Sequence, residues 1–141
     1  MLKDVFDLVG VDLGVAPIAQ GASEVLSGAI DTLGMLGDAM VEVKTGAATG
    51  TPTSYSVACK VTECDTSGGS YADITGATAT LAADGKHAQI RVSGLGTDRK
   101  RYIKISMTPS FTGGTSPKAL VSAAFLNFKL DNPPANSSTA S

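Results

Sequence analysis

The chain has 141 residues, enough for one domain around a single core and too few for two. Its 43% hydrophobic and 17% charged residues, 16 glycines and mean hydropathy of +0.15 indicate more apolar surface than one small core can hide. The formal net charge of -2 argues against a nucleic-acid partner, because such proteins carry a basic face that neutralises phosphates.

The sequence divides into three zones. Residues 1–34 form an apolar arm punctuated by glycine, residues 35–130 alternate in the manner of strands, and residues 131–141 have the composition of an extended tail. No stretch approaches the roughly 18 apolar residues of a membrane span. Asp4 and Asp7 interrupt what would be the apolar centre of a signal peptide, so we expect a chain made in the cytoplasm with no membrane partner.

The arm begins with an apolar stripe at helical spacing (i, i+3, i+4, i+7), which predicts a short helix before Gly10. Two helical turns are marginal alone in water, so this stripe needs a surface to dock on. The tail needs one as well if it is to be ordered. As contacts with other subunits or a larger assembly we assign Leu2, Val5, Phe6, Val9, Pro133 and Pro134.

The segment from Ser23 to Leu33 has two readings. Its apolar residues suit a helix capped by Ser23, whereas Gly28 and the Ser and Thr content suit two short strands around a bend.

From Ala39 the apolar residues recur with a period of two, which indicates strands with one buried face and one wet face. The faces expected in the core are Ala39, Val41 and Val43; Tyr55, Val57, Cys59 and Val61; Ala77, Ala79 and Leu81; Ala88, Ile90 and Val92; and Ile103, Ile105 and Met107. Gly-rich turns separate the strands, and Asp84-Gly85 is the strongest two-residue hairpin pattern. The fold class is therefore all-β: an antiparallel β-sandwich or jelly roll with an N-terminal arm containing a short helix.

The last strand, from Ala119 to Leu130, is apolar on both faces. Such a strand is either covered by a second layer of its own fold or part of a subunit interface. Both readings stay open, and under the second Val121 and Phe125 are interface residues.

Cys59 and Cys64 lie five residues apart on one strand, so their side chains point to opposite faces and we expect free thiols rather than a disulfide or a metal pair. The short basic run from Arg99 to Arg101 is read as a turn before a strand rather than a phosphate patch.

No residue pattern indicates catalysis. The single histidine, His87, is expected in solvent, and Asp65 and Asp73 flank a Ser- and Gly-rich loop with too few oxygens for a cation. The glycine pairs at 68–69 and 113–114 lack phosphate-loop spacing. We therefore expect no enzyme, no cofactor and no metal.

One succession of motifs points to a family. A strand ends in an acidic, Ser-rich turn with an aromatic residue, then comes a KRYI strand, a GGTSP turn and a closing apolar strand. The residues concerned are Glu63, Asp65, Ser67, Tyr71, Lys100–Ile103 and Gly113–Pro117. This succession, over residues 28 to 130, resembles the capsid decoration or cement proteins of tailed bacteriophages. Its motifs are turn chemistry rather than catalytic signatures, and the long arm before residue 28 departs from the family pattern.

The resemblance implies a β-sandwich or jelly-roll subunit on the outside of an icosahedral shell. It would assemble as a homodimer or homotrimer and clamp neighbouring copies of the major capsid protein, which makes it a virion protein with no active site to carry over. One alternative is another phage component from the tail tube, baseplate or head-completion assembly. A second alternative is a carbohydrate-binding or adhesion module, for which three Tyr, four Phe and no Trp supply few stacking rings.

Overall fold

The structure is a computed structural model that describes residues 9–35, 37–82 and 84–128. Within these ranges the chain forms strands and no helix. The strands are β1 (Val9–Gln20), β2 (Val25–Leu26), β3 (Ile30–Asp31), β4 (Gly37–Thr49), β5 (Ser54–Cys64), β6 (Ala72–Leu81), β7 (His87–Leu95), β8 (Tyr102–Thr112) and β9 (Lys118–Phe128). Every pairing between them is antiparallel.

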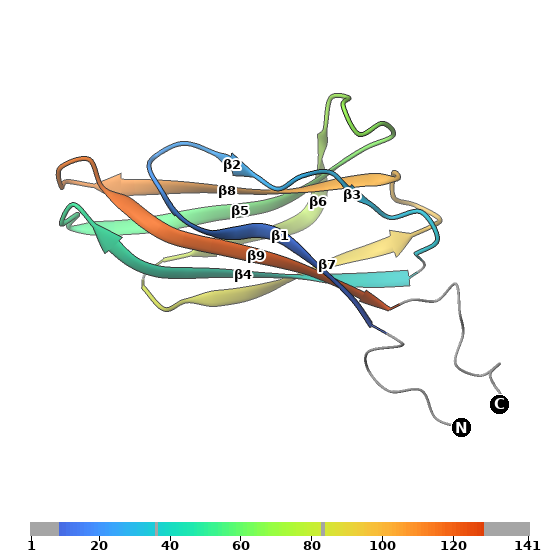
Figure 1. Cartoon of the computed structure of the whole chain (residues 1–141), viewed down its shortest axis with the longest axis horizontal. Helices are drawn as coiled ribbons and strands as arrows, with labels where there is room; N and C mark the ends of the chain where they lie inside the picture. Colours follow the sequence, from blue (N-terminus) through green and yellow to red (C-terminus); the bar gives the residue numbers. More distant parts are fainter. Residues whose placement is uncertain (1–8, 36, 83, 129–141) are drawn as a thin grey trace, which may run out of the picture.

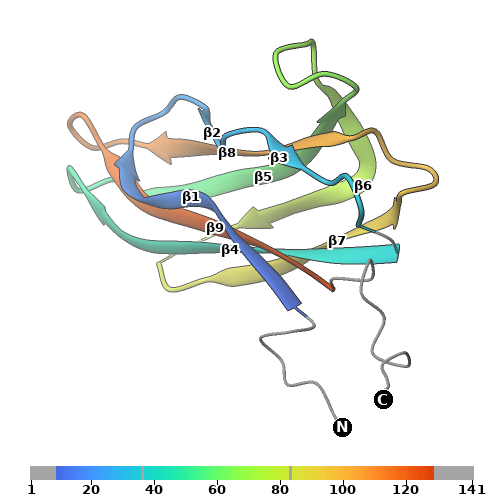
Figure 2. The same ribbon diagram turned by 45° about the vertical axis from the view of Figure 1, so that its right-hand side comes forward.

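Two sheets face each other as the layers of a sandwich (Figure 1). Sheet A has the order β1-β9-β4-β7, and sheet B has the order β2-β8-β5-β6 with β3 also paired to β8. If β2 and β3 are counted as one interrupted strand, this is the strand order of the eight-stranded jelly roll. The prediction of an all-β antiparallel sandwich is confirmed, and Figure 2 shows the two layers from a second direction.

The core lies between the sheets and is built from the faces that the period of two predicts. Phe125, Ile103, Ile105 and Met107 are fully buried. They pack with Val41, Val43, Val57, Val61, Val92 and the other buried apolar residues in one continuous cluster. Ala79 and Ala88 are only partly buried at its margin.

The arm of the sequence prediction is partly wrong, because the sandwich begins at Val9 and not near residue 35. Strand β1 pairs with β9 along its length. The sequence from Val9 to Val15 also alternates, and Gly14 lets β1 pass close to sheet B, since a Cβ there would lie 2.5 Å from Cδ1 of Ile105. The predicted helix falls on residues outside the described ranges, except that Val9 starts a strand.

The segment from Ser23 to Leu33 forms the two short strands, and the helix reading is wrong. Both strands pair with β8, and between them the amide of Ile105 donates to the Ser27 hydroxyl at 2.8 Å. The Ser27 amide donates to the Ile105 carbonyl at 2.9 Å. These bonds satisfy the edge of β8, which a helix would leave unpaired.

The Asp84-Gly85 pair makes a turn, but the hairpin prediction is wrong. Strand β6 belongs to sheet B and β7 belongs to sheet A, so the turn carries the chain across the sandwich. Gly85 has a φ of 70°, which suits the turn whichever strands it joins.

The described chain begins and ends side by side. Val9 is the register partner of Phe128, so β1 starts where β9 stops (Figure 1). The β5–β6 loop and the turn before β8 lie at this same end, because Cys64 pairs with Tyr102. The predicted tail, residues 131–141, lies outside the described ranges.

Candidate interaction surfaces

Strand β9 has one face in the core and one face outward, as its two-sided apolar sequence predicts. Phe125 and Val121 are 0% and 2% exposed inside the sandwich. Their neighbours Leu120, Ala124 and Leu126 point away from the core, and Leu120 is 46% exposed. The outward face of this central strand is therefore mostly apolar, with Ser122 between Leu120 and Ala124.

Strand β4 extends this apolar surface. Met40 is half-buried and lies beside Leu126 in register. Further along, a Cβ at Gly46 would lie 3.0 Å from the Cβ of Leu120, so the absence of a side chain there makes room for the leucine. We call the surface formed by Met40, Leu120, Ala124 and Leu126 the apolar band.

Charged residues flank the apolar band on the side of β7. Lys44 lies 3.5 Å from Glu42, and Arg91 lies 3.6 Å from Asp38. Both pairs are largely exposed, and such pairs contribute about 0 to 1 kcal/mol. His87, opposite Lys44 in register, is exposed on the edge strand β7.

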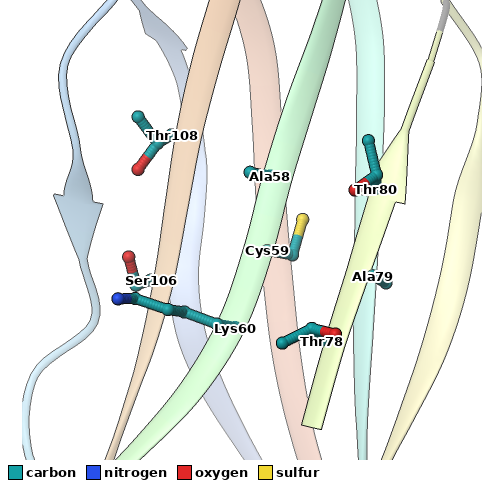
Figure 3. A pocket seen from close by; sticks show the side chains of 8 residues that line it. All are labelled: Ala58, Cys59, Lys60, Thr78, Ala79, Thr80, Ser106 and Thr108. Atoms are coloured by element: carbon teal, nitrogen blue, oxygen red, sulfur yellow. The ribbon is translucent and has the colours of Figure 1, made fainter. Parts of the chain in front are cut away.

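The outward face of sheet B is rich in hydroxyl groups, although Leu26 and Ala58 are also exposed on it. Hydroxyl groups and short side chains surround a depression of about 280 Å³ over β5, β6 and β8 (Figure 3). Its lining is Ala58, Cys59, Lys60, Thr78, Ala79, Thr80, Ser106 and Thr108. Lys60 pairs with Asp73 at 3.0 Å, and the Ser106 hydroxyl donates to the Glu24 carboxylate. None of the lining residues is aromatic, so this depression has no ring on which a sugar could stack.

The basic run before β8 is neutralised by three carboxylates from two segments, the end of β5 and strand β3. Arg99 lies 3.6 Å from Glu63, Lys100 lies 3.7 Å from Asp65, and Arg101 pairs with Asp31. The reading of this run as a turn before a strand is confirmed, since β8 begins at Tyr102.

The pair of Arg101 and Asp31 is the closest of the three. Nε and Nη2 of Arg101 donate to the two carboxylate oxygens at 2.9 and 2.8 Å. These bonds, with a bond from the Leu33 amide, lower the pKa of Asp31 from 3.8 to about 2. The guanidinium also lies 5.0 Å from the ring centre of Tyr102, in cation-π contact.

The acidic turn and the KRYI strand, which lie far apart in sequence, meet at this end. The Lys100 amide donates to Glu63 at 2.9 Å, and the ammonium of Lys104 lies 4.6 Å from the ring centre of Tyr71. The Tyr71 hydroxyl donates to the Ser67 carbonyl at 2.8 Å and closes the loop. Asp65 and Asp73 pair with different lysines, and the described residues contain no group of three or more His, Cys, Asp or Glu that could hold a metal.

A hollow of about 310 Å³ lies between the Thr32–Met35 turn and the basic run, lined also by Gly96, Arg99 and Arg101. Nε of Arg99 is buried there without a hydrogen-bond partner among the described residues. Leu33, on the rim, is 72% exposed.

The GGTSP turn lies at the opposite end and is locked to the β4–β5 loop. The Thr115 amide donates to the Gly50 carbonyl at 2.8 Å. A Cβ on Gly50 would come within 2.5 Å of the Thr115 carbonyl oxygen, so only glycine fits. Thr51 and Ser116 adopt φ values of 50° and 44°, a strained region that the two packed loops hold in place.

Both cysteines are free, as predicted, and both are buried, although the sequence placed them on opposite faces of the strand. Burial raises the pKa of the Cys59 thiol to about 11, so it stays protonated and unreactive at neutral pH.

Of the residues assigned to an interface, Leu2, Val5, Phe6, Pro133 and Pro134 lie outside the described ranges. Val9 is described only as the first residue of β1. Val121 and Phe125 are covered by the chain's own second sheet, which matches the alternative reading of a core strand. The outward neighbours Leu120, which is exposed, and Leu126, which is partly buried, are residues that the assignment missed.

Known proteins resemble this chain in fold only. No protein-family model matches it, and no curated protein sequence is similar to it. The crystal structure of the PBSX exported protein XepA superposes with a TM-score of 0.57 at 10% identity, covering 84% of this chain and 36% of XepA. The chain thus spans little more than a third of that protein.

Two further solved structures are more distant. The structure of infectious bursal disease virus Gx strain has a TM-score of 0.45 at 14% identity, covering 84% of this chain and 32% of that chain. A carbohydrate-binding module in complex with β-1,4-galactotriose, TmCBM61, has a TM-score of 0.42 at 11% identity, covering 91% and 87%. At these levels of similarity neither structure decides a function.

The described part of the chain has no helix long and apolar enough to cross a membrane.

Proposed function

We propose that the chain is a virion structural protein without enzymatic activity, which decorates a phage capsid and stabilises it by binding between major capsid protein subunits. The supporting observation is the apolar band, an outward apolar surface on the central strand of sheet A. A solitary sandwich would leave Leu120 and its neighbours in water, whereas a protein built into an assembly covers them.

The arrangement of the sandwich suits this role, because the described chain enters and leaves it at one end, where Val9 pairs with Phe128. A protein that binds the assembled shell, and not its loose subunits, adds mass-action stability to the shell. Partners are the major capsid protein and further copies of the chain.

Copy number on purified heads tests the proposal. We expect a gel of heads from the encoding phage to show this protein at a stoichiometry approaching that of the major capsid protein. Heads made without the gene should rebind the purified protein to saturation and withstand more heat. A few copies per particle would instead favour a tail-tube, baseplate or head-completion protein, and an absence of rebinding would contradict decoration.

A further inference from the structure

We propose that residues 1–8 of one copy lie along the apolar band of a second copy. This inference deepens the proposed function, on which it rests, because it names the partner that covers the outward face of sheet A. Leu2 and Phe6, which share one face of an extended segment, would then supply the apolar contacts.

The length of the segment matches the length of the surface. Leu120 and Leu126 are six residues apart on β9, which is about 20 Å at the rise of a strand. The eight residues before Val9 reach up to about 26 Å when extended. One such segment can therefore cover the band from end to end.

The position of Val9 favours a second copy over the segment's own sandwich. Because Val9 pairs with Phe128 at the end of the sheet, a chain continuing the line of β1 leads away from the molecule. To reach its own band the chain would have to reverse immediately before Val9. Residues 1–8 (MLKDVFDL) contain neither glycine nor proline, the residues that most favour so tight a turn.

The charges beside the apolar band are complementary to the segment. Lys44 and Arg91 are exposed, and the ion pairs they form at 3.5 and 3.6 Å are long and solvated. Asp4 lies between Leu2 and Phe6 on the same face of an extended segment and supplies a carboxylate that these cations can meet. The outward face of sheet B has one exposed leucine, Leu26 on the short strand β2, but no row of apolar residues along a central strand.

Disulfide trapping between two differently tagged chains tests the contact. One chain carries Phe6→Cys and the other carries Leu126→Cys, and the two are mixed under mild air oxidation. We expect a linked pair containing both tags on a non-reducing gel. The matched control replaces Leu126→Cys by Thr80→Cys on the outward face of sheet B, and it should give little linkage. The native thiols are buried and do not interfere.

Other outcomes would overturn the inference. In the double variant Phe6→Cys/Leu126→Cys, a disulfide within one chain would show that the segment covers its own band. If neither the mixed single variants nor the double variant forms a disulfide, something other than residues 1–8 covers the apolar band. A wild-type chain that is monomeric by sedimentation equilibrium would show the same. Deletion of residues 1–8 should abolish self-association while the β-sheet circular dichroism persists.

Head binding is measured separately, on the wild-type chain. If the wild-type chain binds heads but the cysteine variants form no disulfide between copies, the arm contact is wrong and the decoration proposal remains supported. If the variants link but the wild-type chain does not bind heads, the arm contact is supported and the decoration proposal is wrong.

Discussion

The outward faces of the two sheets differ although both sheets share one core. On sheet A the central strand β9 presents two leucines, an alanine and Ser122 to the outside. On sheet B the two central strands present mainly threonine, serine and lysine, a carboxylate pairs with Lys60, and the exposed Leu26 lies on the short strand β2. One side of the sandwich is thus suited to water and the other to a partner, which indicates the direction from which an assembly would approach.

The two faces of β9 give the largest expected effect. Phe125→Ala should lower the free energy of unfolding by about 3 to 5 kcal/mol, because it leaves a cavity between the sheets. Leu126→Ala, on the adjacent outward position, should cost about 1 kcal/mol or less in the isolated chain, because its side chain keeps water contact. Urea unfolding measures both. Equal losses of unfolding free energy in the two variants would contradict the assignment of Phe125 to the core and Leu126 to the outward face.

A charge placed on each outward face sharpens the comparison between the sheets. Leu126→Lys should weaken binding to heads or self-association about tenfold, since it forfeits roughly 1.4 kcal/mol of apolar contact. Thr80→Lys, on the exposed face of sheet B, should leave binding nearly unchanged. Sedimentation velocity and head co-sedimentation report the two affinities. A stronger effect of Thr80→Lys would assign the partner to sheet B instead.

The smallest expected effect concerns pH, and it belongs to the ion pairs around β3 and β8. The folded pKa of Asp31 is about 2, below its ordinary 3.8, so the pair with Arg101 stabilises the fold fully above pH 3.8. That contribution disappears as the pH falls through about 2. The wild-type chain should therefore lose stability between these values.

Asp31→Asn is the matched variant for this pH effect. It should be less stable at neutral pH and should show a shallower dependence of the urea midpoint between pH 3.8 and 2. Identical pH profiles for the two proteins would contradict the role of the pair.

The period of two predicted much of the core because each strand from β4 to β8 carries one apolar face. Val41 and Ile105 are in the core for that reason. The same rule could not tell which face of β9 lies in the core, because both faces of this strand are apolar. Only its register with β4, where Phe125 lies beside Val41, sends Phe125 inward and Leu126 outward.

Two local patterns misled the sequence prediction for different reasons. The helical spacing of residues 2 to 9 concealed the alternation that starts at Val9 and supplies β1. The Asp84-Gly85 pair specifies a bend of the backbone but carries no information about which strands the bend connects. The neutralisation of Arg99, Lys100 and Arg101 also depends on residues distant in sequence.

The position of β9 in sheet A constrains how the chain folds. Among the described strands it leaves the ribosome last, yet it separates β1 from β4 and pairs with both. Until β9 is made, β1 has no neighbour in its own sheet. Sheet A is therefore completed late, through contacts between strands far apart in sequence, and this slow route leaves strand edges unpaired and favours aggregation when many copies are made at once.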